Sequence, residues 1–182
     1  AVVELEKKLG DRFLLITQNV DGLHLRAGNS LKKTFQIHGN IETLRCAKAC
    51  SKETYSIPES VAPKERHEPL KDQEKEALKC PRCQAWLRPH VLWFDECYDE
   101  ENYHFNSSIE AAADADVLLV VGTSGATNLP MQVGSIAAGK GAVIVDINPD
   151  FNPFSAIATK NGGFFLQGPS GQILPELVGL FG

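Results

Sequence analysis

Short apolar runs alternate along this chain with amphipathic segments. Runs of strand length occupy residues 13–17, 34–37, 117–121, 142–147 and 164–166, and polar residues or glycine follow each of them. Helical patterns lie at residues 2–9, 21–26, 99–113 and 130–138, and a last helix ends at residue 180. Buried strands that alternate with helices predict an α/β fold with a doubly wound parallel sheet and helices on both faces.

The pattern changes between residues 40 and 88, where apolar periodicity is weak. Two cysteine pairs, Cys46 with Cys50 and Cys80 with Cys83, bracket a stretch rich in Pro, Lys and Glu. Each pair can present two thiolates from one turn, and two such turns complete a tetrahedral zinc site. Four thiolates leave no open position, so we predict one structural zinc ion that stabilises a small insert domain. Four unconnected free cysteines are the alternative.

Composition narrows the possible functions. The 182 residues are 43% hydrophobic and 23% charged, as in an ordinary globular protein. A net charge of −5 argues against direct nucleic-acid binding, which needs a basic face. No apolar run approaches the roughly 20 residues that span a bilayer, and the first residues have the pattern of an amphipathic helix. We therefore expect a cytoplasmic protein that binds no membrane.

Polar side chains follow two of the predicted strands. Gln18, Asn19 and Asp21 come after the first, and His38 comes after the second. Open α/β sheets bind ligands at the carboxyl ends of their strands. A lone histidine is more often a core residue that bonds a backbone carbonyl. A carboxylate, two amides and an imidazole at neighbouring strand ends are costly to bury without partners, so they predict a ligand-lined cleft.

Two turns could contact a phosphate or a ribose. Gly122, Thr123 and Ser124 follow a buried strand, where glycine admits close approach and the next helix attracts anions. The Gly-Pro-Ser-Gly loop at residues 168–171 also offers backbone groups. Each turn taken alone is equally typical of an ordinary connection. The chain has neither a G-x-G-x-x-G motif nor a P-loop lysine motif, which argues against an ordinary dehydrogenase or NTPase.

Taken in order, these segments resemble the sirtuin family of NAD-dependent protein lysine deacylases, in a bacterial-type member. The resemblance rests on Thr-Gln-Asn-Val-Asp at 17–21, His38-Gly39, the four-cysteine insert, Arg-Pro-His-Val-Leu-Trp-Phe at 88–94, Gly-Thr-Ser at 122–124, Asn148 and residues 168–171. It implies a Rossmann-like NAD-binding domain formed by residues 1–39 and 89–182. Residues 40–88 would form a small zinc-binding module, with the site in the cleft between the two.

The resemblance also implies a catalytic set of His38, Asn19 and Asp21. His38 would be the general base that takes a proton from a ribose hydroxyl of NAD, since an imidazole is largely neutral at pH 7. Asn19 would order the ribose and a water molecule, and Asp21 would receive the nicotinamide carboxamide. The products would be nicotinamide, the free lysine and O-acyl-ADP-ribose.

Further residues are assigned to binding by the same resemblance. The NAD contacts would be Gln18, Asn19, Asp21, Gly122, Thr123, Ser124, Asn148 and Ser170. The acylated lysine of a protein or peptide would bind to Leu92, through its backbone, and to Trp93 and Phe94, which would wall an apolar tunnel. Core packing is the alternative role for these two aromatic residues.

Two departures from the family pattern affect these expectations. The family's Gly-Ala-Gly-Ile-Ser turn and first Rossmann strand should precede Ala1 and are absent, so we expect a truncated form that is weakly active or inactive. Asp95 stands where most members have glycine, which puts acceptance of the substrate backbone in question. The sequence leaves a deacetylase and a desuccinylase equally open. A non-catalytic, zinc-stapled peptide-binding module and an NAD-dependent protein ADP-ribosyltransferase remain alternatives.

Overall fold

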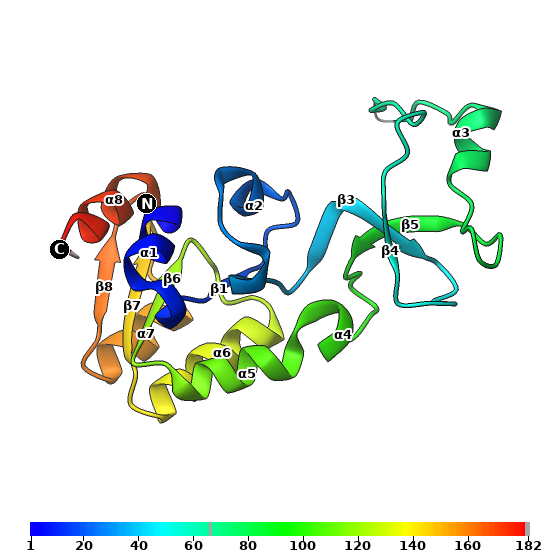
Figure 1. Cartoon of the computed structure of the whole chain (residues 1–182). Coiled ribbons are helices and arrows are strands. Elements are labelled where there is room, and N and C mark those ends of the chain that lie inside the picture. Colours follow the sequence, from blue (N-terminus) through cyan, green and yellow to red (C-terminus); the bar gives the residue numbers. More distant parts are fainter. Residues whose placement is uncertain (66, 181–182) are drawn as a thin grey trace.

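The computed structural model describes residues 1–65 and 67–180, and its parallel strands are divided over two sheets (Figure 1). Strand β1 (Leu15–Thr17) pairs with β2 (Thr34–Gln36) in a two-stranded parallel sheet. Strands β6 (Val117–Val121), β7 (Val143–Asn148) and β8 (Phe164–Gln167) form a three-stranded parallel sheet in that order. The predicted α/β class is confirmed, although the parallel strands form two hydrogen-bonded sheets where one was expected.

Helices cover both faces of the three-stranded sheet, and β7 is buried between them. Ile144 of β7 packs into a core with α5 (Phe105–Asp114), α6 (Asn128–Gly139) and α7 (Pro153–Lys160). Val145 and Ile147 belong to a second core with α1 (Val2–Leu9) and α8 (Ser170–Gly179). Successive strand residues point to opposite faces, so an unbroken apolar run suits a strand that is covered on both sides.

The two parallel sheets share one core. Ile16 of β1 and Phe35 of β2 pack against the cluster that contains Ile144 and Val120. Helix α2 (Leu23–Ala27) and the short 3-10 turns η1 (Gly10–Arg12) and η2 (Leu31–Lys33) connect the first elements. Among the described residues, no helix is both long and apolar enough to cross a bilayer.

A separate antiparallel sheet forms the insert and lies beside the parallel sheets (Figure 1). Strand β3 (Gly39–Cys46) pairs with β4 (Thr54–Ser56) and with β5 (Leu87–Val91), and α3 (Asp72–Ala77) lies in the excursion between β4 and β5. The pairing of β3 with β5 reaches Val91, three residues beyond the predicted boundary at residue 88. At Gly39 the backbone has φ 84, and a Cβ would lie 1.9 Å from the His90 carbonyl oxygen, so this position requires glycine.

One helix prediction is corrected. The single helix expected over residues 99–113 is broken into α4 (Glu100–Tyr103) and α5, because His104 takes a left-handed φ of 53 and stacks on Phe35 at 4.5 Å between ring centroids. Glu100 then caps the new helix by accepting the Ser107 N–H at 3.0 Å.

Helix α7 was not predicted at all. Its start carries ordinary signals: Asn152 accepts the Phe154 N–H at 2.8 Å, and Pro153 occupies the first helical position. Asp146 of β7 accepts further hydrogen bonds from Asn152 and Ser155 at 2.8 and 2.6 Å, which ties the helix start to the sheet.

Candidate functional site

His38 lies half-buried directly after β2, at the carboxyl end of the two-stranded sheet. The Ile37 N–H donates to the Thr17 carbonyl at 3.0 Å, which extends the parallel pairing beyond Gln36. The Leu92 N–H donates to the His38 carbonyl at 3.0 Å. Backbone bonds on both sides therefore fix His38 next to the segment that follows β5.

Both ring nitrogens of His38 have a partner. Nδ1 lies 3.1 Å from the Gln18 carbonyl oxygen, and Nε2 lies 2.7 Å from the Tyr98 hydroxyl. A carbonyl oxygen can only accept, so Nδ1 carries the proton of the neutral ring and Nε2 offers the lone pair. Burial lowers the pKa of His38 from 6.5 and outweighs the opposite effect of the Gln18 carbonyl. The lone pair of the neutral ring is therefore on Nε2, the nitrogen at which an imidazole of this tautomer can accept a proton.

A strand-end network, made of Gln18, Thr123, Thr127 and Asn148, joins the carboxyl ends of the two parallel sheets. The Gln18 side chain donates to the Thr123 hydroxyl and accepts from the Thr127 hydroxyl, both at 2.9 Å. Asn148 donates to the Thr123 carbonyl at 2.8 Å, and its own carbonyl accepts the Gly168 N–H at 3.0 Å. Three of the residues expected to bind NAD, Gln18, Thr123 and Asn148, are thus brought together.

The other residues expected at the cofactor turns lie at the same edge. Gly122 has φ 61, and no atom comes within 4 Å of the position a Cβ would take, so its backbone is open to close approach. Ser124 is exposed beside it, and Ser170 is the first residue of α8. The described structure therefore leaves room for a ligand over this turn.

Asn19 and Asp21 make local hydrogen bonds after β1. Asn19 is exposed, and its N–H donates to the Thr17 hydroxyl at 3.1 Å. The Asp21 carboxylate accepts the Leu23 N–H at 3.0 Å at the start of α2. No hydrogen bond joins either side chain to His38 among the described residues.

Glu96 anchors the predicted substrate-binding residues Leu92 to Phe94. Its carboxylate accepts the Trp93 N–H at 2.9 Å and pairs with Arg45 at 2.7 Å and also with Arg88. The Arg88 guanidinium lies 4.4 Å from the centroid of the Trp93 ring. Trp93 is 52% exposed and Phe94 is fully exposed. The turn is thus fixed at its base while its aromatic rings face solvent.

Removing the Glu96 carboxylate should loosen this turn. We expect Glu96→Ala to lower the free energy of unfolding by about 1.5–3 kcal/mol, the range for hydrogen bonds to charged groups. In a Trp86→Phe background, Trp93 fluorescence should become more accessible to acrylamide. Urea denaturation and quenching measure the two effects. The control is Glu101→Ala, which removes an exposed pair with Lys52 and should cost under about 1 kcal/mol. Equal losses in both variants would contradict the anchoring role of Glu96.

Sequence reasoning missed Tyr98, Thr127 and Glu96. Tyr98 is 60 residues from His38 along the chain, and no spacing rule connects the two. Thr127 follows the predicted Gly-Thr-Ser turn but carries no motif of its own. Their contacts, with His38, Gln18 and Arg45 respectively, join segments that are far apart along the chain.

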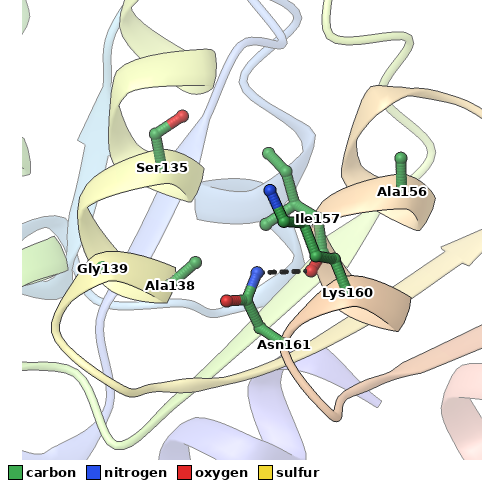
Figure 2. A pocket seen from close by; sticks show the side chains of 7 residues that line it. All are labelled: Ser135, Ala138, Gly139, Ala156, Ile157, Lys160 and Asn161. Carbon is green, nitrogen blue, oxygen red and sulfur yellow. Dashed lines mark hydrogen bonds between the residues drawn. The ribbon is translucent and has the colours of Figure 1, made fainter.

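A shallow groove between α6 and α7 is separate from the predicted site residues (Figure 2). Its volume is about 380 Å³, and it is lined by the carboxyl-terminal parts of both helices, including Ala138, Ile157 and Asn161. Helix α6 leaves the carboxyl end of β6 and returns to the start of β7, so the groove faces the edge of the sheet opposite His38. It contains none of the predicted site residues.

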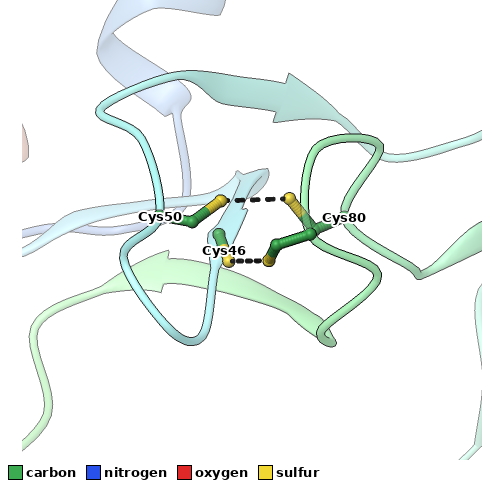
Figure 3. Close-up of side chains that lie close together, drawn as sticks. Cys46, Cys50 and Cys80 are labelled. Carbon is green, nitrogen blue, oxygen red and sulfur yellow. Dashed lines mark hydrogen bonds between the residues drawn. The ribbon is translucent and has the colours of Figure 1, made fainter.

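The four insert cysteines form a single cluster (Figure 3). The sulfur atoms of Cys46 and Cys83 lie 3.5 Å apart, those of Cys50 and Cys80 lie 3.6 Å apart, and all four fall within 4.8 Å of one another. Zinc–sulfur bonds of about 2.3 Å in a tetrahedron separate the sulfurs by roughly 3.8 Å. The cluster therefore fits one structural zinc ion, and its close spacing favours this over unconnected cysteines.

The backbone around this cluster favours a thiolate at Cys46. The N–H groups of Cys50 and Lys48 approach the Cys46 sulfur and lower its pKa to about 6. Cys97, the fifth cysteine, is exposed and lies outside the cluster. At Cys50 the effect is the opposite, because hydrogen bonding with the Cys83 thiol and burial raise its pKa to about 12. The backbone thus favours the metal-binding thiolate form at Cys46 and not at all four sulfurs.

Comparison with known families gives the class of this protein. The model of the Sir2 family matches residues 1–128. The chain therefore belongs to the Sir2 family, as its resemblance to the sirtuins predicted.

Curated relatives and solved structures agree with this assignment. An NAD-dependent protein deacylase of Leptospira interrogans is 43% identical over 178 residues, which cover 98% of this chain and 64% of that protein. One of Pyrococcus furiosus is 39% identical with the same two coverages. The structure of a Sir2 homologue in complex with NAD matches with a TM-score of 0.78 and 33% identity, covering 98% of this chain and 61% of that one. The chain thus spans just under two thirds of the length of these proteins.

Proposed function

We propose that this chain acts as an NAD-dependent protein lysine deacylase, in which His38 is the general base. The observation that carries the proposal is the neutral imidazole whose Nε2 lone pair lies at the carboxyl ends of parallel strands, beside the strand-end network. The relatives from Leptospira and Pyrococcus bear the name of this activity, and an NAD complex is known for a Sir2 homologue of the same fold.

The residues at this edge are those that would bind NAD. Gly122, Thr123 and Ser124 would hold the diphosphate at the start of α6, where the helix dipole favours anions. Asn148 and Ser170 would contact the adenosine ribose. Gln18, Asn19 and Asp21 would line the pocket for the second ribose and nicotinamide. Residues 1–39 and 89–182 would thus form the NAD-binding domain, and residues 40–88 the zinc module that completes the cleft.

The chemistry divides between the cofactor and the chain. NAD, when bound, supplies the ribose carbon that the acyl oxygen attacks and nicotinamide as the leaving group. His38 accepts a proton from a ribose hydroxyl at Nε2, while Nδ1–H stays on the Gln18 carbonyl and holds the ring in place. Asn19 positions a water molecule. Leu92, Trp93 and Phe94 receive the acylated lysine of a protein or peptide, which would add as an extended strand.

The pH dependence of the reaction follows from the environment of His38. Because burial lowers the pKa of His38 below 6.5, we expect kcat/KM to be level at pH 7–8 and to fall only at a pH below 6.5. The free energy of unfolding should depend on pH in the same direction. The unfolded chain binds the His38 proton at a higher pH than the folded chain does. The contribution of His38 to the free energy of unfolding is therefore complete above pH 6.5, and it is lost as the pH falls toward the pKa of the folded state. A pH–rate profile tests this, and an acid limb centred above 6.5 would contradict it.

Product analysis by mass spectrometry tests the proposed function. The chain is incubated with NAD and peptides that carry acetyl-lysine or succinyl-lysine. Nicotinamide together with O-acyl-ADP-ribose would establish the deacylase. ADP-ribose attached to protein would establish the transferase, and peptide binding without products would indicate a docking module. If the chain yields no product, a chimera with the part of the Leptospira relative outside the match is assayed, and a silent chimera would overturn the proposal.

A further inference from the structure

The hydroxyl of Tyr98 is hydrogen-bonded to the basic nitrogen of His38, Nε2. Since Nδ1 is committed to the Gln18 carbonyl, Nε2 can only accept in the neutral ring, and the Tyr98 O–H therefore donates to it at 2.7 Å. Burial raises the pKa of Tyr98 and outweighs the opposite effect of a hydrogen bond with Thr127. The phenol thus keeps its proton at neutral pH, and the lone pair that the reaction needs is taken.

Nε2 has one lone pair in the plane of the ring. It cannot accept a proton from a ribose hydroxyl while the Tyr98 hydroxyl holds it. We propose that Tyr98 is a removable cap on His38, a positioning residue that holds the Nε2 lone pair until a ribose hydroxyl replaces it. The cap itself follows from the contacts of His38, whereas its replacement by ribose rests on the proposed function.

The released hydroxyl has a second partner at hand. Thr127 lies against the Tyr98 hydroxyl and also donates to the Gln18 side chain at 2.9 Å. Gln18 in turn contacts Thr123, which lies in the turn expected to bind the diphosphate. A cofactor that contacts Thr123 and Gln18 would therefore act on the residue that receives the displaced cap.

Tyr98 is also linked to the residues proposed to bind the peptide. Tyr98 belongs to the segment without helix or strand that joins β5 to α4, and this segment also carries Trp93 and Phe94. Its ring packs on Phe105 at 6.4 Å and on His38 at 5.8 Å between centroids. Rotation of one side chain can expose Nε2 without moving a regular element. The cap is thus placed where both substrates can bias it.

Chemical labelling tests the cap without any turnover. Diethyl pyrocarbonate reacts with the lone pair of a neutral imidazole, and peptide mapping gives a separate rate for each histidine. We expect His38 in Tyr98→Phe to react roughly three- to tenfold faster than in the unmodified chain, the factor for loss of a hydrogen bond of ordinary net strength. The exposed His67 serves as the internal reference. Phenylalanine keeps the ring packing, and circular dichroism verifies the fold.

Two controls separate the cap from other effects. Thr127→Val leaves the Tyr98 hydroxyl on Nε2, so labelling of His38 should not accelerate. His104, stacked on Phe35 beside this region, should keep its rate in Tyr98→Phe. An unchanged His38 rate in Tyr98→Phe, or an equal rise at His104, would overturn the cap. If His38 reacts faster but NAD fails to slow it again, the cap stands and the ribose assignment of the proposed function is what fails.

Discussion

Replacing His38 by alanine is expected to lower kcat/KM for an acylated peptide by a factor of about 10² to 10⁴, the usual contribution of a positioned general base. The variant loses the Nε2 lone pair, which in the folded chain lies at the carboxyl edge of the parallel strands. NAD binding should change much less, because the residues proposed for its diphosphate lie on another sheet. Product formation by mass spectrometry and NAD affinity by calorimetry measure the two effects.

The matched control is His67→Ala, which removes an exposed histidine of the insert. Its kcat/KM should equal that of the unmodified chain. If the chain is silent in this assay, both substitutions are made in the chimera with the Leptospira relative. Retention of full activity by His38→Ala would contradict the assignment of the base, whereas a parallel loss of NAD affinity would indicate a structural role for His38.

Replacing Cys80 by serine is expected to unfold the insert. Structural zinc sites of this kind contribute about 10–16 kcal/mol of apparent binding energy at pH 7, which is folding energy when no preformed site exists in the unfolded chain. Within the described part of residues 40–88, the buried apolar side chains are Leu44, Cys46 and Cys80. So small a core cannot replace the metal. We expect less than one zinc per chain by elemental analysis and a partial loss of the β-sheet signal by circular dichroism, because the parallel sheets lie outside the insert.

Cys97→Ser provides the control for this experiment, because Cys97 is exposed and lies outside the cluster. That variant should retain one zinc ion and an unchanged melting temperature. A chelator added to the unmodified chain should reproduce the effect of Cys80→Ser and leave Cys80→Ser itself nearly unaffected. Full retention of the insert fold in the metal-free chain would show that packing alone stabilises it.

The elements that sequence patterns predicted well are those with a local cause. The apolar run at β7 is a strand that helices cover on both faces, and the unbroken run is typical of such burial. The run at β6 pairs with it, although Val117 and Val121 at its two ends are exposed. The zinc cluster was predictable because short cysteine spacings force two ligands into one turn. Helix α1 ends at Gly10 as its pattern indicated.

The elements that were missed depend on contacts between distant residues. The break at His104 follows from its stacking on Phe35, which no local propensity reports. Tyr98 meets His38 only after β5 has paired with β3 and turned back toward the sheet. Glu96, in the segment after β5, acquires its role from Arg45, which lies 51 residues away on β3. Helix α7 differs, since its Asn152-Pro153 start is a local signal that could have been used.

The division of the parallel strands over two sheets affects which strands unfold locally first. Among the described strands, β7 has backbone partners on both sides, whereas β1 and β2 pair only with each other. Amide protection should therefore decline from β7 outward and be weaker at β1 and β2, since fewer bonds must break to expose them. The candidate site lies at the boundary between the two parallel sheets. The Gln18 side chain, which follows β1, bonds to Thr123 and Thr127, which follow β6. A ligand that contacts both parallel sheets would have to order the less stable one, β1 with β2. The free energy of that ordering would reduce the affinity of the ligand.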